Sequence, residues 1–253
     1  SPRAGQTSTY ERIGFGRFNS HGFVKTGGSS IKFKNCRFFN NGWGIKHGPP
    51  NVDSIGRILG LGMDFRCDAR FTVAEFDGCD ISGNGDNGAS DLDPGLGFGA
   101  FFMNIKRVII DNSSFVTNGW EGSYRSAQGS AIYAYSAPIT ARNTKFVANS
   151  IKHPGNGGTV NLVNASGGSA FTNCLWLANG NNWYGAFGNG GHSGALFVNL
   201  SSSADKVDLD HCTFAYNIEG SMDKYDGGMQ YPAPAGLYVY RGSAKVRNSI
   251  FWG

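Results

Sequence analysis

The first residues whose types suggest chemistry are aromatic side chains in the Gly- and Asn-rich stretches of this 253-residue chain. Tryptophan and tyrosine occur there beside asparagine, aspartate and arginine. A flat ring can pack on the apolar C–H face of a sugar while polar neighbours bind its hydroxyls, so the pattern points to carbohydrate contact. The same rings could equally pack loops or contact another protein. The residues are Trp43, Trp120, Tyr124, Trp183, Tyr184, Tyr225 and Tyr231.

Residues 83–95 form the most acidic stretch of the chain. Its carboxylates Asp86, Asp91 and Asp93 could supply oxygen ligands to a hard cation, and Ca²⁺ is the one cofactor that the sequence suggests. Their spacing does not complete the known calcium-loop pattern, and a solvated acidic loop is the commoner outcome for such a stretch. Asp91 or Asp93 could instead pair with Glu121 as the two carboxylates of a glycoside hydrolase.

Basic residues offer a different chemistry, that of a polysaccharide lyase. Such an enzyme needs a base to abstract a proton and a cation to neutralise the carboxylate of the substrate. No spacing singles out one set of basic residues. The candidates are Lys25, Arg66, Arg70, Lys106 and Arg107.

All of these residues stand between copies of one repeated unit, whose clearest copy is FTNCLWLAN at residues 171–179. The same position of the unit recurs seven times, at separations of 30 to 43 residues. A fixed motif at variable spacing predicts a constant coil with loops of differing length, which is a solenoid. The recurring position is occupied by Asn35, Gly78, Asn112, Asn143, Asn173, His211 and Asn248.

The chemistry within the unit predicts the kind of coil. Apolar residues alternate as in a β-strand on both sides of the recurring position, and Asn and Gly tolerate the left-handed backbone of a sharp bend. A second asparagine column ends the second strand, at Asn41, Asn84, Asn118, Asn149, Asn179 and Asn217. A third strand precedes each unit, at residues 99–102, 130–133, 158–161, 194–197 and 235–238. Three short strands per coil, in about eight coils, predict an all-β parallel β-helix.

These motifs resemble the right-handed parallel β-helix superfamily, which includes pectate-lyase-like enzymes. The G-A-I-Y-like strands and the N-C-x-F-x-x-N strands are most similar to repeats of polymorphic outer-membrane and adhesin-type bacterial β-helix proteins. The segment NSIFWG at residues 248–253 resembles a segment of bacterial β-helix surface proteins. The resemblance covers nearly the whole chain and implies one domain over residues 1–253. It does not imply one function, because lyases, hydrolases, adhesins and fibres share the fold. The N-T-D, D-D, G-H-G and R-I-K motifs of its hydrolases are absent from the sequence.

The composition limits the kinds of partner that we expect for this chain. Charged residues make up only 16% of the chain and Gly occurs 39 times, which suits many tight corners and is unusual for a helical or α/β enzyme. The net charge of +4 is spread without a basic run, so nucleic acid is not an expected partner. No long apolar stretch predicts a membrane span. The first residue, Ser1, fits a mature exported protein or a trimmed chain, and we expect a secreted or cell-surface location.

Four cysteines, Cys36, Cys79, Cys174 and Cys212, occupy the same position in their coils, and Cys67 lies outside this column. Stacked coils would bring them together in two pairs about 4.8 Å apart. They could be free thiols serving as small core residues, or at least one pair could form a disulfide. The predicted apolar core consists of Phe33, Phe38, Phe76, Ile110, Phe115, Phe146, Phe171, Trp176, Leu209, Phe214 and Phe251.

The two ends of the chain suggest an assembly. Residues 1–20 read as a degraded first coil, and the chain stops in the middle of a coil with no evident C-terminal cap. Either the chain belongs to a longer rod, or its uncovered ends meet those of neighbours and build a head-to-tail filament. We therefore expect a structural or adhesive rod whose aromatic loop face contacts glycans or subunits. The alternative is a carbohydrate-active enzyme, a lyase before a hydrolase, working along the same face.

Overall fold

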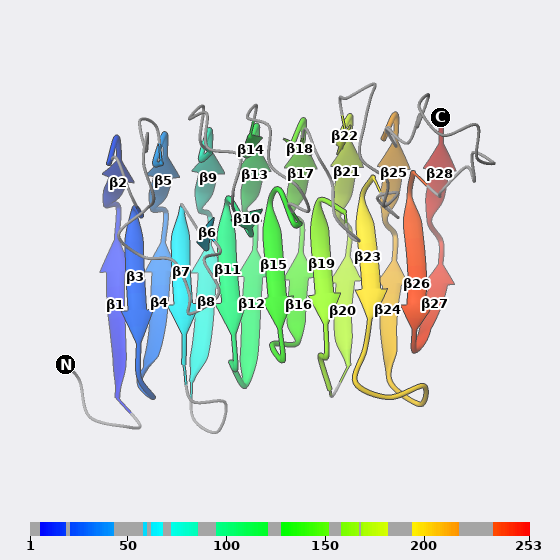
Figure 1. The fold of residues 1–253 in the computed structure, drawn as a ribbon, viewed down its shortest axis with the longest axis horizontal. Coiled ribbons are helices and arrows are strands. Elements are labelled where there is room, and N and C mark those ends of the chain that lie inside the picture. The colour runs from blue at the N-terminus through cyan, green and yellow to red at the C-terminus, as the bar shows by residue number, and fades with distance from the viewer. Residues whose placement is uncertain are drawn as a thin grey trace.

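Three long parallel sheets run side by side along the whole rod in the computed structural model of the chain (Figure 1). Each coil contributes one strand to each sheet in turn, so the predicted all-β parallel β-helix of about eight coils is confirmed. Strands β1 and β28 lie at opposite ends of the rod (Figure 1). The structure describes residues 6–18, 21–42, 58–59, 62–67, 72–85, 95–120, 128–151, 158–166, 168–181, 194–217 and 235–253.

The three long sheets, which we call A, B and C, differ in strand length. Sheet A contains β1 (Thr7–Glu11), β4 (Ser30–Lys34), β8 (Val73–Asp77), β12 (Arg107–Asp111), β16 (Ile139–Arg142), β20 (Ser169–Thr172), β24 (Lys206–Asp210) and β27 (Ser243–Arg247). Sheet B contains β2 (Gly14–Gly16), β5 (Arg37–Phe39), β9 (Asp80–Ser82), β13 (Ser114–Val116), β17 (Lys145–Val147), β21 (Leu175–Leu177), β25 (Thr213–Ala215) and β28 (Ile250–Trp252). Sheet C contains β3 (Phe23–Thr26), β7 (Met63–Arg66), β11 (Ala100–Met103), β15 (Ile132–Tyr135), β19 (Val160–Val163), β23 (Leu196–Asn199) and β26 (Leu237–Arg241).

Two short sheets extend the coils beyond sheet B, and no sequence motif predicts them. One contains β14 (Gly119–Trp120), β18 (Ser150–Ile151) and β22 (Gly180–Asn181), and the other pairs β6 (Ile58–Leu59) with β10 (Gly95–Leu96). Strands β14, β18 and β22 each begin directly after an asparagine of the second column. They therefore mark the corner at which each coil leaves sheet B.

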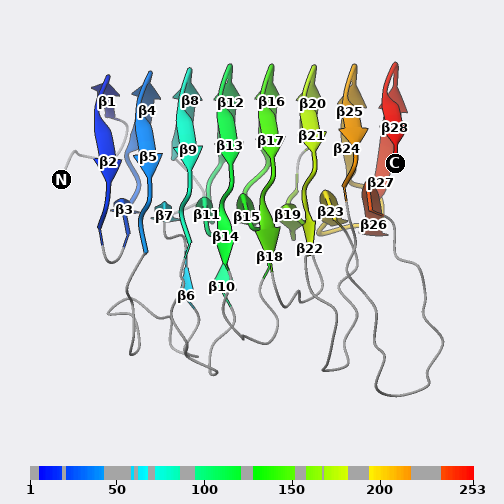
Figure 2. The ribbon, with the colours of Figure 1, turned by 90° about the horizontal axis from the view of Figure 1, so that it is seen from above.

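The recurring position of the repeat forms the bend between sheets A and B, which follow one another in each coil (Figure 2). All seven of its residues adopt a left-handed backbone, with φ between 48° at Asn248 and 64° at Gly78. Asn and Gly tolerate this conformation better than other residues, which explains the composition of the column. The bend predicted from the motif is confirmed.

Aromatic rings stack from coil to coil inside the rod. Trp176 lies between Phe146 and Phe214, with ring centroids 4.9 and 4.4 Å away. Ten of the eleven predicted core residues are buried. Phe251 is the exception, because it belongs to the last described coil and stacks on Phe214 with one face only. Its side chain is 48% exposed, so its assignment to the buried core was wrong.

The second asparagine column forms a ladder inside the rod. The Nδ2 group of Asn149 donates to Oδ1 of Asn179 in the next coil and to the carbonyl oxygen of Phe115 in the previous one. Its Oδ1 accepts from both the backbone nitrogen and Nδ2 of Asn118. Each amide is therefore fully hydrogen-bonded in a buried position, which makes burial of the polar group tolerable. The same pattern links Asn41, Asn84, Asn118, Asn149, Asn179 and Asn217.

The cysteine column also carries hydrogen bonds. The Sγ atom of Cys174 lies 3.6 Å from the carbonyl oxygen of Ala141 and 3.4 Å from that of Thr172. Thr144 Oγ1 makes the corresponding contacts one coil earlier. The column thus needs a small side chain with a donor, which Cys, Ser and Thr all provide. The five cysteines are free in the structure, so the stacked-thiol alternative describes the four of the column, and Cys67 lies outside it.

Candidate functional site

The outer face of sheet A carries two rows of outward-facing side chains. One row, nearer the middle of the strands, contains Thr9, Lys32, Glu75, Ile109, Thr140, Ala170, Asp208 and Lys245. The other, which we call the corner row, contains Glu11, Lys34, Asp77, Asp111, Arg142, Thr172, Asp210 and Arg247. Parallel pairing in register brings equivalent positions of successive coils to about 4.8 Å from each other. Charged residues of both signs therefore stand in lines along the rod.

An exposed amide ladder borders the corner row. Asn173 Nδ2 donates to Asn143 Oδ1 at 2.8 Å, and Asn143 Nδ2 donates to Asn112 Oδ1 at 3.1 Å. The preceding coil has Gly78 at this position, which offers no amide oxygen. Asn112 Nδ2 donates instead to Asp77 Oδ1, at 2.9 Å. The ladder thus ends on a carboxylate and fixes its orientation.

A hollow of about 300 Å³ opens on this face over strands β4, β8, β12 and β16. The ion pair of Lys32 and Glu75, with Nζ and Oε2 3.0 Å apart, stands on one side of it. The hydrogen bond to Glu75 raises the pKa of Lys32, so the ammonium group stays charged. Ile109 follows Glu75 in the same row and also lines the hollow.

Asp111 gives the hollow its polar character. It is the strand partner of Asp77 on one side and of Arg142 on the other, and all three line the hollow. The Oδ1 atom of Asp111 is buried and has no hydrogen-bond partner. A buried acceptor without a donor is unfavourable, so the carboxylate of Asp111, which lines the hollow, lacks one of its hydrogen bonds.

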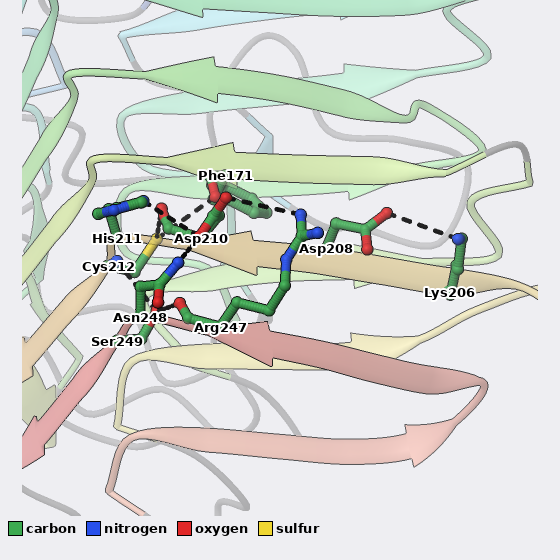
Figure 3. A network of polar contacts seen from close by, with 9 residues as sticks. All are labelled: Phe171, Lys206, Asp208, Asp210, His211, Cys212, Arg247, Asn248 and Ser249. Carbon is green, nitrogen blue, oxygen red and sulfur yellow. Dashed lines mark hydrogen bonds and ion pairs between the residues drawn. The ribbon is translucent and has the colours of Figure 1, made fainter.

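The same construction recurs near the last coil, around Asp210 (Figure 3). Asn248 Nδ2 donates to Asp210 Oδ1 at 3.0 Å, because His211 stands where other coils have an amide oxygen. His211 Nδ1 lies 3.1 Å from Asp210 Oδ1, and an Arg247 nitrogen lies 3.5 Å from Oδ2. The hydrogen bond from Asn248, followed by the charge of Arg247, lowers the pKa of Asp210. This carboxylate is held ionised and already has donors.

Asp210, His211 and Cys212 are consecutive, but they do not form a nucleophilic site. The Cys212 thiol is buried and lies 3.4 Å from the carbonyl oxygen of Phe171, whereas the His211 side chain is largely exposed (Figure 3). The two side chains point to opposite sides of the sheet. A cysteine nucleophile needs an accessible sulfur next to its base, and this geometry does not provide one.

Arg66, a candidate base from the sequence, lies at the end of β7 in sheet C. Its Nη2 lies 2.6 Å from Asp64 Oδ2 and its Nε lies 3.1 Å from Oδ1, which is a bidentate ion pair. Asp64 is buried, and His21 Nε2 lies 3.9 Å from its Oδ2. Burial raises the pKa of Asp64, while the hydrogen bond from Arg66 acts in the opposite direction. Arg66 is thus held as a cation that neutralises a buried carboxylate.

The other basic candidates that the structure describes lie on different sheets. Lys25 in β3 donates from Nζ to Ser29 Oγ at 2.8 Å. Lys106 and Arg107 are both exposed. Arg107 is the first residue of β12 in sheet A, and Lys106 directly precedes it. Lys106 donates its backbone N–H to the carbonyl of Thr72.

Most of the aromatic and acidic candidates lie outside the described residues. They are Trp43, Tyr124, Trp183, Tyr184, Tyr225, Tyr231, Asp86, Asp91, Asp93 and Glu121, and the basic candidate Arg70 also lies outside. Of Trp120 only the backbone, in β14, is described. Six described ranges end at residues 42, 85, 120, 151, 181 and 217, each at or within two residues of the buried asparagine ladder. These end points lie along one edge of the rod, where the chain leaves sheet B.

We did not predict from the sequence that the outer face of sheet A is a candidate site. Its residues vary from coil to coil, so no repeated motif marks them. Alternation was the available signal, because every second residue of a sheet A strand faces outward once the inward positions are known. Applied to RVIID at residues 107–111, that rule places Ile109 and Asp111 on the surface.

Comparisons with protein-family models, with curated proteins and with solved structures find no match. Within the described ranges, no three His, Cys, Asp or Glu side chains are grouped so that they could hold a metal ion. Nor does that part of the chain contain a helix with the length and apolar character needed to cross a membrane.

Proposed function

We propose that this chain is a secreted or cell-surface structural rod of the adhesin-type bacterial β-helix kind, which presents its loops along one edge. The observation that carries the proposal is the continuous amide ladder from Asn41 to Asn217. Every rung fixes the spacing of the next coil, so the segments attached beside it are displayed at regular intervals on a stiff support. The aromatic residues of those segments would contact glycans or neighbouring subunits.

We extend this proposal to head-to-tail assembly with a second copy of the chain. The last described coil exposes Phe251, Ile250 and Trp252, the end of the aromatic stack. At the other end, the half-buried Phe15 packs on Phe38 with ring centroids 4.9 Å apart. Ile81 separates these two rings from the stack that begins at Phe115. In the corner row, Glu11 stands at one end and Arg247 at the other. Stacking a second copy on the last coil would bring these opposite charges together and extend sheets A and B.

The experiment is sedimentation velocity at increasing protein concentration and low salt. Arg247→Glu and Glu11→Arg should each weaken assembly, and the double variant should restore it, because the charges are exchanged. Arg142→Glu, in the same row away from both ends, is the matched control and should assemble as the parent does. A monomer at every concentration, or a double variant no better than the single ones, contradicts the assembly. Circular dichroism of each variant checks the fold.

A second candidate function, a polysaccharide lyase, has one observation in its favour. The buried Asp64 and its partner Arg66 lie on sheet C, whose strands directly follow the segments attached at the loop edge. Perturbed carboxylates beside loops are frequent at active sites, although structural ion pairs share this property. Ultraviolet absorbance of the unsaturated product, measured during incubation with uronate polysaccharides, tests this alternative. Assembly without any cleavage would remove it.

A further inference from the structure

The hollow on the outer face of sheet A has the size of a small-ligand site and is lined mainly by charged and amide side chains. Its volume of about 300 Å³ is at the lower end of the range for ligand pockets, so it suits one or two small rings. It lies on sheet A and not at the loop edge between sheets B and C. An inference about it therefore goes beyond the proposed rod function and needs only the fold.

The hydrogen-bonding groups of the hollow alternate between acceptors and donors. Asp111 Oδ1 is a buried acceptor without a partner. The side-chain amides of Asn112 and Asn143 use one contact each as donors, to Asp77 and to Asn112, and an amide nitrogen carries two hydrogens. Arg142 adds a guanidinium, which only donates. A ligand must therefore both donate to a carboxylate and accept from amides within a short distance.

The charges and the apolar surface narrow the ligand further. The lining contains two cations, Lys32 and Arg142, and three carboxylates, Glu75, Asp77 and Asp111, which leaves one negative charge in excess. This balance disfavours anions such as uronates and phosphates. Ile109 supplies an apolar surface among these polar groups. Vicinal hydroxyls that donate and accept, next to a C–H face, are the chemistry of a neutral sugar ring.

We propose that this hollow binds a neutral glycosyl unit, with a ring hydroxyl donating to the carboxylate of Asp111 and the C–H face on Ile109. A neighbouring hydroxyl accepts from the amide of Asn112 or Asn143. The site thereby gives the rod a sugar contact on sheet A in addition to any contact at its loop edge.

The test follows the side-chain amide signals of Asn112 and Asn143 by ¹H–¹⁵N NMR during titration with methyl glycosides of glucose, galactose, mannose and N-acetylglucosamine. Asp111→Asn should weaken binding by about tenfold or more, since a hydrogen bond to a charged group is lost. Ile109→Phe should abolish it by filling the hollow. Ala170→Phe, at the same row position two coils away, is the matched control and should bind as the parent does.

Three outcomes overturn the proposal. The first is the absence of a saturable shift with every glycoside. The second is binding that Ile109→Phe leaves unchanged in a variant whose circular dichroism matches that of the parent. The third is tighter binding of glucuronate or Ca²⁺ than of any neutral glycoside, which would make the hollow an anion or cation site. None of these results bears on head-to-tail assembly, which sedimentation measures separately.

Discussion

Asn149 and Asn179, thirty residues apart in the sequence, are hydrogen-bonded through their buried side chains, with Nδ2 of the first 3.0 Å from Oδ1 of the second. This contact is one rung of a ladder. In its interior rungs, from Asn84 to Asn179, both amide hydrogens and both oxygen lone pairs of each side chain have a partner. Buried polar groups are stabilising in such a network only while all members are present. The ladder is therefore the most sensitive part of the fold to substitution.

Asn149→Ala should lower the free energy of unfolding by about 3 kcal/mol, because it leaves the buried donors of Asn118 and the carbonyl of Phe115 without partners. Asn143→Ala is the matched control, since it removes an amide from the exposed ladder. It should lower the free energy by about 1 kcal/mol, mainly through the left-handed backbone that alanine tolerates poorly. Urea denaturation measures both values. Equal losses would show that the buried ladder contributes no more than the exposed one.

Gly119 stands where the chain leaves the ladder, with φ of 140°. A Cβ atom at this position would lie 1.7 Å from the carbonyl oxygen of Ser150 in the next coil, and neither backbone can move independently. Gly119→Ala should lower the free energy of unfolding by about 3 kcal/mol or more, or prevent folding. Gly28→Ala, where a Cβ has nothing within 4 Å, should be neutral or stabilising by up to about 1 kcal/mol. A stable Gly119→Ala variant with a parental thermal midpoint would contradict the close approach of the coils.

Cys174 tests whether the cysteine column requires a donor or only a small volume. Cys174→Ser keeps a hydrogen-bond donor toward Ala141 and Thr172, as Thr144 does in the preceding coil. Cys174→Val keeps the apolar volume and loses the donor. We expect serine to change the free energy of unfolding by less than about 1 kcal/mol and valine to lower it by about 2 kcal/mol. The reverse order, with valine better tolerated, would show that the column is purely apolar packing.

The thiols should also differ in reactivity with a disulfide reagent. Burial raises the pKa of Cys79 to about 11, so little thiolate exists at neutral pH. Cys36, Cys79, Cys174 and Cys212 are buried and should react only after unfolding, whereas the half-buried Cys67 should be labelled first. Mass spectrometry of the labelled peptides identifies the order. Early labelling of Cys79 would contradict its burial.

The pKa values of two aspartates should be shifted in opposite directions from the ordinary value. Burial raises the pKa of Asp64 above its ordinary value of 3.8, and the hydrogen bond from Asn248 lowers that of Asp210. Between 3.8 and the raised pKa of Asp64, the folded state binds more protons than the unfolded state. The contribution of Asp64 to stability therefore rises as pH falls through this window and levels off below 3.8.

Carboxyl ¹³C chemical shifts followed over pH measure both midpoints directly. Asn248→Ala should bring the pKa of Asp210 back toward 3.8 and leave that of Asp64 unchanged. An Asp64 midpoint below 3.8 would mean that the ion pair with Arg66 outweighs burial.

The bends and most of the core could be predicted from the sequence, because each coil repeats the same local requirement. A left-handed corner selects Asn or Gly, as at Asn143 and Gly78, and inward positions alternate with outward ones. Two properties could not be predicted in this way. Both columns consist mainly of asparagines, so the sequence does not distinguish the exposed ladder of Asn143 from the buried ladder of Asn149. The periodicity of the sequence also does not show that Phe251 stacks with one face only, on Phe214.

The hollow on sheet A could not be predicted from the sequence for a different reason. Its hollow depends on Asp77, Asp111 and Arg142 being strand partners, although they are more than thirty residues apart. That juxtaposition follows only after the length of each loop has been assigned and the register is known. Repeated motifs define the interior of a solenoid, whereas function on its surface arises from positions that differ between coils.

In-register stacking of the coils is tested most directly by pulsed electron paramagnetic resonance. Spin labels attached through non-natural amino acids, so that the cysteines take no part, would be placed at Thr9 and Lys245 and, separately, at Thr9 and Thr140. These outward positions are separated by seven and four coil spacings along sheet A. The predicted backbone separations are about 34 Å and about 19 Å, since each spacing is about 4.8 Å. Distances in this ratio support the stacked rod, and distances that do not scale with coil number would contradict it.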